Sequence, residues 1–217
     1  MSKPEGDLTG RDRLVRNLIA RWLGQIVVVV SGFIIPRLID DSLGPSSLGI
    51  WDLGWSTVSY FRLMGLGFAG GLNRFVALYN ARGGTADLRR AVSSTCFLQL
   101  VIAAVTAAAA LTLAYFLPAV FSRIGESDMR SAQYLVAFLG GSLAVRMLFW
   151  PARGILTGHH YWTVTSAVTA CGDITVLAGL YLALKTGGGL AELGFVVFSA
   201  SFFTEAARAG MAKRVYK

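Results

Sequence analysis

Long, uninterrupted apolar segments constrain this chain more than any other feature of its sequence. An α-helix needs about 20 mostly apolar residues to cross a bilayer. Six segments meet that need, at approximately residues 17–39, 47–72, 91–116, 132–156, 161–184 and 190–211. They are continuously apolar rather than alternating over about ten residues, which favours helices over membrane strands. The sequence therefore predicts an all-α integral membrane protein, a six-transmembrane-helix bundle.

Turn-forming residues separate these segments. Gly44-Pro45 and Pro118 are examples, and such residues mark breaks between helices. The connections are short, so consecutive helices are expected to be antiparallel neighbours. The predicted organisation is a polar N-terminal tail, one helical lobe and a short C-terminal end, at residues 1–16, 17–211 and 212–217.

The charge content also points to lipid as the solvent. Only 15% of the residues are charged, whereas a soluble domain has about 25%. The net charge of +8 is compatible with nucleic-acid binding, but nucleic-acid-binding proteins gather Lys and Arg on a patch of a soluble fold. Here the basic residues fall mostly between apolar segments, so we expect no nucleic-acid partner.

The placement of the basic residues predicts an orientation. Thirteen of the 20 Lys and Arg residues lie in the N-terminal tail, the second-to-third and fourth-to-fifth connections, and the C-terminal end. The opposite set of connections has only four. Because cytoplasmic loops carry the excess of Lys and Arg, we expect a multi-pass protein of the cell (cytoplasmic) membrane with both termini in the cytoplasm.

Three arginines remain within the apolar segments after the two sides are counted: Arg21, Arg62 and Arg146. Charged residues at that depth are costly and mark functional sites by default. The guanidinium groups of Arg62 and Arg146 could hold a phosphate through two parallel hydrogen bonds each. Alternatively, nearby acids neutralise them. Arg21 is only one turn inside its segment and could extend to the membrane surface.

The second segment carries polar residues on one helical face. Asp52, Ser56, Ser59 and Arg62 follow one another at intervals of four, three and three. Lipid cannot satisfy such groups, so we expect this face to form one wall of a polar cavity. Arg62, Arg146, Arg21 and Ser59 are accordingly the predicted substrate-binding residues.

Two acids, Asp52 and Asp173, lie in the second and fifth segments. Such residues carry protons or bind coupling cations in many pumps; alternatively, they pair with the arginines and set the geometry of a gate. Glu205 and Arg208 are three residues apart and are expected to form a local ion pair. Pro151 is expected to bend the fourth helix.

No feature of the sequence predicts catalysis, a metal site or a cofactor. His159-His160 is a weak metal signal, because a metal site needs further ligands at defined spacing. Cys96 and Cys171 lie in apolar segments without a disulfide or metal pattern and are predicted to be packing residues. No nucleophile and base arrangement is indicated, so we do not expect an enzyme.

Three stretches resemble a known transporter family: NLIARWLGQIVVVVSGFIIPRLI, SLGPSSLGIWDLGWSTVSYFRLMGLGFAGGLNRFVALY and ARGILTGHHYWTVTSAV. They are similar to the N-terminal lobe of polysaccharide flippases. These are the O-antigen (lipopolysaccharide) and exopolysaccharide transporters of the multidrug/oligosaccharidyl-lipid/polysaccharide exporter superfamily. The resemblance covers all six segments through loose hydrophobic patterns.

The resemblance implies half of a two-lobed transporter that moves polyprenyl-diphosphate-linked oligosaccharide across the cytoplasmic membrane by alternating access. A second lobe, a second copy of the chain or a separate subunit would complete the cavity. Arg62 and Arg146 would then contact the diphosphate. A cation-coupled multidrug exporter lobe that depends on Asp52 and Asp173, and a non-transporting scaffold subunit of a polysaccharide-assembly complex, are the alternatives. A membrane glycosyltransferase is the least favoured reading.

Overall fold

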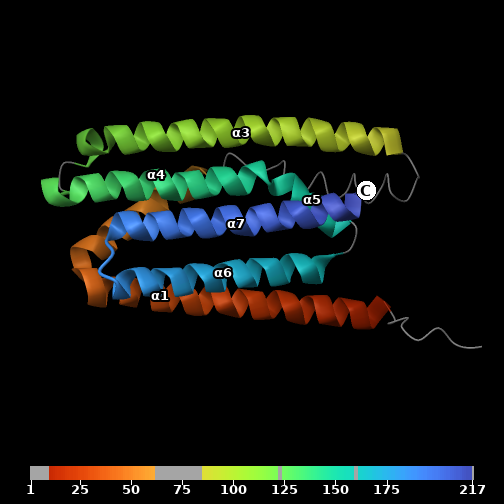
Figure 1. Ribbon diagram of the computed structural model, residues 1–217, viewed down its shortest axis with the longest axis horizontal. Coiled ribbons are helices and arrows are strands. Elements are labelled where there is room, and N and C mark those ends of the chain that lie inside the picture. The colour runs from red at the N-terminus through yellow and green to blue at the C-terminus, as the bar shows by residue number, and fades with distance from the viewer. Residues whose placement is uncertain (1–9, 62–84, 122–123, 159–160, 217) are drawn as a thin grey trace, which may run out of the picture.

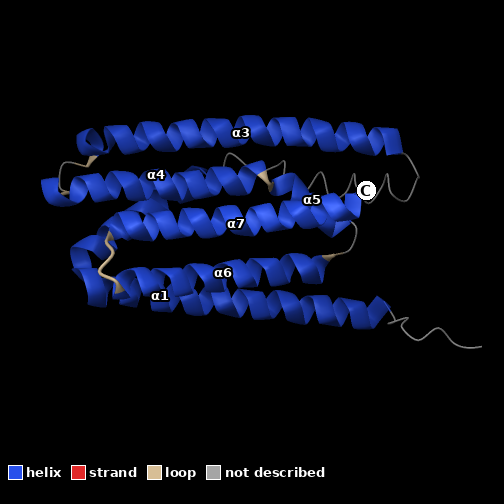
Figure 2. Ribbon diagram, in the orientation of Figure 1, coloured by secondary structure: helices blue, strands red, loops and turns tan. Residues whose placement is uncertain are grey.

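The computed structural model describes residues 10–61, 85–121, 124–158 and 161–216. All the regular secondary structure in these ranges is helical, and short loops join the helices (Figure 2). The helices are α1 (Gly10–Phe61), α3 (Thr85–Val120), α4 (Glu126–Leu148), α5 (Trp150–Gly158), α6 (Trp162–Lys185) and α7 (Leu190–Tyr216).

Helix α1 consists of two limbs, residues 10–43 and 45–61, that meet at a kink. Gly44 has φ 83° and ψ 171°, a conformation that glycine adopts without steric cost. Pro45 follows, and its fixed φ suits the first turn of the second limb. The break predicted at Gly44-Pro45 is therefore confirmed.

A second break separates α4 from α5. Helix α4 ends at Leu148, and Pro151 is the second residue of α5. Proline has no N–H to donate and its ring clashes with the preceding turn, so the chain restarts as a new helix. This confirms the bend predicted at Pro151. It also places Arg146 and Arg153 on opposite sides of the break.

The long helices lie roughly parallel, and α4 packs against both α3 and α7, while α6 packs against α7 and α1 (Figure 1). Leucines and valines of α4 and α7 form the centre of the core, among them Leu135, Leu139, Leu193 and Val197. Small residues let the helices approach closely. A methyl group built on Gly140 of α4 would lie 2.2 Å from Cβ of Ala110 on α3.

Four described helical stretches are long and apolar enough to cross a membrane: Val92–Val120, Asp128–Gly158, Trp162–Lys185 and Leu190–Arg214. Large apolar side chains cover their outer surface, including Phe97, Tyr115 and Phe203. Contiguous exposed apolar surface is rare on soluble proteins. The chain is thus an all-α, multi-pass membrane protein.

The structure supports four spans in its described part, and not the six expected from the sequence. The expected span 17–39, in the first limb of α1, is not among these four stretches, and the side chains of several of its residues lie outside the described part. The expected span 47–72 corresponds to the second limb of α1 as far as Phe61, and its remainder lies outside the described residues.

The helix ends divide the basic residues as the sequence predicts. The starts of α1, α3 and α6 and the ends of α5 and α7 lie at one end of the bundle (right in Figure 1). Arg89, Arg90, Lys213 and Arg214 belong to this end, whereas Arg130 and Lys185 belong to the other.

Candidate functional site

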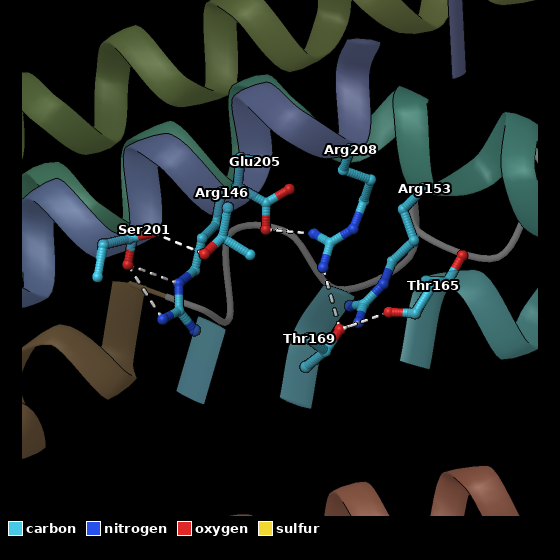
Figure 3. Close-up of polar contacts among 9 residues, drawn as sticks. Arg146, Arg153, Thr165, Thr169, Ser201, Glu205 and Arg208 are labelled. Carbon is cyan, nitrogen blue, oxygen red and sulfur yellow. Dashed lines mark hydrogen bonds and ion pairs between the residues drawn. The ribbon is translucent and has the colours of Figure 1, made fainter. Parts of the chain in front are cut away.

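A polar network joins α4, α5, α6 and α7 inside the bundle (Figure 3). It contains three arginines, Arg146, Arg153 and Arg208, which we call the arginine cluster. Each comes from a different helix: α4, α5 and α7, respectively. The break before α5 and the packing of α6 on α7 bring these helices together.

Arg208 is the most deeply buried member, with 3% of its surface exposed. Its Nη1 contacts Oε1 of Glu205, one helical turn earlier on α7, which confirms the predicted ion pair. Its Nη2 donates to the hydroxyl of Thr169 at 3.0 Å. Its Nε is buried without a hydrogen-bond partner among the described residues. Arg208 thus retains one unused donor in the interior.

The hydroxyl of Thr169 on α6 receives hydrogen bonds from two guanidinium groups. Nη2 of Arg153 donates to it at 3.2 Å, in addition to Nη2 of Arg208. The hydroxyl itself donates to the carbonyl of Thr165 at 2.9 Å. Two like charges therefore converge on one neutral oxygen. An anionic oxygen would stabilise the same pair of donors more strongly, because charge-assisted hydrogen bonds are about twice as strong as neutral ones.

Arg146 lies at a second level of the cluster. Its Nε and Nη2 donate to the hydroxyl of Ser201 at 3.3 and 3.1 Å. Ser201 is seven residues before Arg208 on α7, which corresponds to about 10 Å along the helix. Ser201 is buried, whereas the side chain of Arg146 is exposed at the edge of the network. The cluster therefore extends over two helical turns.

The acids near the cluster do not balance its charge. Glu205 pairs with Arg208, and Asp173 on α6 lies within electrostatic range of all three arginines. Oδ2 of Asp173 is buried without a hydrogen-bond partner among the described residues. Among the described residues, three guanidinium groups face two carboxylates, so this part of the network carries an excess positive charge. Its low-dielectric surroundings strengthen the attraction for an anion.

The face predicted as a cavity wall points away from the packed core. Asp52 and Ser59 on the second limb of α1 are both exposed, and the hydroxyl of Ser59 donates to the carbonyl of Trp55 at 2.7 Å. The opposite face, with Gly54 and Val58, is buried. A methyl group on Gly54 would lie 3.1 Å from Leu139, so this apolar face is the one that fits against α4. Within the described part, Asp52 and Ser59 do not join the arginine cluster.

The other predicted site residues divide into two groups. Arg146 and Asp173 belong to the polar network or lie within its electrostatic reach. Arg62 lies outside the described residues, and the side chain of Arg21, on α1, is likewise outside the described part.

Sequence reasoning did not identify Arg153, Arg208, Thr169 and Ser201 as parts of one site. The charge count places Arg153 with the basic residues of the fourth-to-fifth connection, although it also continues the polar face of Arg146 on the fourth segment. The useful signal was the alignment of Thr169 with Asp173 on one helical face, together with the pairing of Glu205 and Arg208 on another. Periodicity alone could not show that these two faces meet.

No protein-family model matches this chain, and comparisons with curated proteins and with solved structures gave no significant match. Among the described residues, no group of three or more His, Cys, Asp or Glu side chains could hold a metal ion. The donor groups of the arginine cluster are suited to an anionic oxygen ligand.

Proposed function

We propose that this chain is one lobe of an alternating-access transporter that moves a polyprenyl-diphosphate-linked oligosaccharide across the cytoplasmic membrane for polysaccharide biosynthesis. The observation that carries the proposal is the arginine cluster. Three guanidinium groups lie together in an apolar bundle, and Glu205 is the carboxylate that pairs with Arg208. Such charges are costly within a membrane and are retained for a ligand or a transport path.

The chemistry of arginine favours a phosphate ligand. Its planar guanidinium presents five donors in a fixed fork that matches phosphate oxygens in pairs. The two levels of the cluster, at Ser201 and at Thr169, would offer successive contacts to a diphosphate as it moves along the bundle. A polyprenyl chain would remain in the lipid beside the apolar outer surface of the helices.

The transport path needs a second wall. The charges of Arg146 and Asp52 are exposed, and an exposed charge is costly against lipid. A second lobe, a second copy of the chain or a separate subunit would cover these groups and complete a cavity shared with membrane lipids and the substrate. The excess of basic residues at the end of the bundle that holds the end of α7 favours a cytoplasmic position for that end.

Complementation of a strain that lacks its polysaccharide flippase tests the proposal. The wild-type gene should restore surface polysaccharide, whereas Arg146→Gln and Arg62→Gln should reduce it by at least about tenfold, since each removes a charge-assisted contact to phosphate. Arg130→Gln is the matched control, because Arg130 is exposed at the opposite end of the bundle. Full restoration by an Arg62→Gln/Arg146→Gln double variant would refute the proposal.

Oδ2 of Asp173 is buried and has no hydrogen-bond partner within the described ranges, which favours a cation-coupled multidrug exporter lobe as the second candidate. A carboxylate oxygen of this kind suits a proton or a coupling cation. In that case Asp173→Asn and Asp52→Asn should abolish drug resistance in an exporter-deficient strain, while Arg146→Gln should leave it intact. The opposite pattern, with loss of polysaccharide on changing Arg146, supports the flippase.

A further inference from the structure

The ion pair between Glu205 and Arg208 differs from an ordinary structural pair in three respects. Glu205 contacts one nitrogen of Arg208, Nη1, and Nε is buried with no hydrogen-bond partner in the described part of the chain. Both residues are buried, with 8% and 3% of their surfaces exposed. Finally, the two residues lie on the same helix, so the pair does not hold α7 to a neighbouring helix and could open without separating the bundle.

Two guanidinium groups meet at the same oxygen beside Arg208. Nη2 of Arg208 and Nη2 of Arg153 donate to the same hydroxyl oxygen of Thr169, at 3.0 and 3.2 Å, respectively. Arg153 is only half-buried and its guanidinium lies 5.7 Å from the ring of Trp150. An anion that contacts the partly exposed Arg153 is therefore within a short distance of Arg208.

We propose that Glu205 is a displaceable counter-ion, and that a phosphate group of the transported lipid competes with its carboxylate for Arg208. A phosphate can accept from Nε and Nη2 of the same guanidinium, of which Nε is a donor that Glu205 does not use, and its negative charge then replaces the carboxylate as the counter-ion of Arg208. Glu205 thus keeps Arg208 neutralised inside the membrane until the ligand arrives. This inference rests on the proposed function, because it assigns a regulatory element to the same site.

Displacement makes a prediction that a purely structural pair does not. If Glu205 and the ligand compete, removing the carboxylate strengthens ligand binding even though it weakens the fold. A structural ion pair predicts the reverse, because leaving a buried charge unpaired destabilises the protein and disturbs the site. Affinity and thermal stability should therefore change in opposite directions.

Binding of polyprenyl diphosphate to the full chain in lipid nanodiscs tests this prediction. Glu205→Gln should bind the probe roughly tenfold more tightly than the wild type, as expected for removal of one charge-assisted competitor. Glu205→Asp retains the charge on a shorter side chain and should give a smaller gain in affinity. This variant replaces Glu205→Gln in the test if Glu205→Gln does not fold. The double variant Glu205→Gln/Arg208→Gln should lose the gain.

The outcomes separate the two proposals. Unchanged or weaker binding in both Glu205 variants, with wild-type binding still dependent on Arg146, would overturn the displacement inference and leave the proposed function standing. No binding of polyprenyl diphosphate by the wild type or any variant would overturn both. A gain that persists when Arg208 is also replaced would show that Glu205 does not compete for Arg208, and would overturn the inference alone.

Discussion

Thr169 is the residue on which the arrangement of the arginine cluster depends most directly. Its hydroxyl accepts from Arg153 and Arg208 and donates to its own helix. It therefore links α5, α6 and α7 through one oxygen atom. Because both donors are charged, loss of this acceptor leaves two guanidinium groups partly unsatisfied in the interior, where unmade hydrogen bonds are expensive.

Replacing Thr169 by Val tests this role, because the two side chains have nearly the same shape. We expect the free energy of unfolding to fall by about 1–3 kcal/mol, the usual cost of leaving a buried donor unsatisfied. Thermal unfolding in detergent measures the change. Thr175→Val is the matched control on the same helix, since the Thr175 hydroxyl is exposed and bonds only to the carbonyl of Cys171. Equal effects of the two substitutions would contradict the role of Thr169.

At the scale of the helices, much of the fold could be predicted from local sequence. The expected segments 161–184 and 190–211 correspond to α6 at Trp162–Lys185 and α7 at Leu190–Tyr216. The breaks at Gly44-Pro45 and Pro151 were also predictable, because they depend on backbone chemistry within a few residues. The number of spans was not, because apolar content alone also selected the two limbs of α1, which are not among the four candidate spans of the described part.

The candidate site was less predictable because it depends on how helices rotate against one another. Arg146 and Asp173 could be selected as charges within apolar segments, and they lie in or near the network. The grouping of Arg153 with Arg208 needed the contact of α5 with α6 and α7. The outward direction of Asp52 and Ser59 follows from the better fit of Gly54 against Leu139, which a pattern of polar spacing does not reveal.

Gln133 shows how α4 compensates for a proline in α3. Pro118 has no N–H for the carbonyl of Ala114, four residues earlier, and Nε2 of Gln133 donates to that carbonyl at 2.9 Å. Replacing Gln133 by Leu should lower the free energy of unfolding by about 1–2 kcal/mol, in the range of hydrogen bonds between membrane helices. Thermal unfolding of Gln25→Leu, an exposed position on α1, provides the control; a cost no larger than that of the control would contradict this account.

The close approach of α3 and α4 depends on Gly140. A methyl group there would lie 2.2 Å from Cβ of Ala110, so Gly140→Ala should destabilise the bundle by about 1–3 kcal/mol through overpacking. A compensating Ala110→Gly change should recover part of the loss. Gly210→Ala, where a methyl group would meet nothing within 4 Å, should be neutral or stabilising. If unfolding experiments show the same stability for Gly140→Ala and Gly210→Ala, this account of the packing is contradicted.

At the scale of the whole molecule, the two ends of the bundle differ in charge. Arg89, Arg90, Lys213 and Arg214 lie at one end. The proposed cytoplasmic position of this end predicts the result of labelling with a membrane-impermeant maleimide, after Cys96 and Cys171 are replaced by Ala. Thr186→Cys should react in intact cells, and Lys213→Cys only after the membrane is permeabilised. The reverse pattern would contradict the orientation.

The central claim is that the arginine cluster of this membrane bundle binds the diphosphate of a lipid. The most direct measurement compares the affinity of the purified chain in nanodiscs for polyprenyl diphosphate and for the uncharged polyprenol. The account predicts at least about tenfold tighter binding of the diphosphate, and loss of that preference in Arg146→Gln/Arg153→Gln but not in Arg130→Gln. Equal affinity of the wild type for the two lipids, or a preference that survives the double substitution, would contradict it.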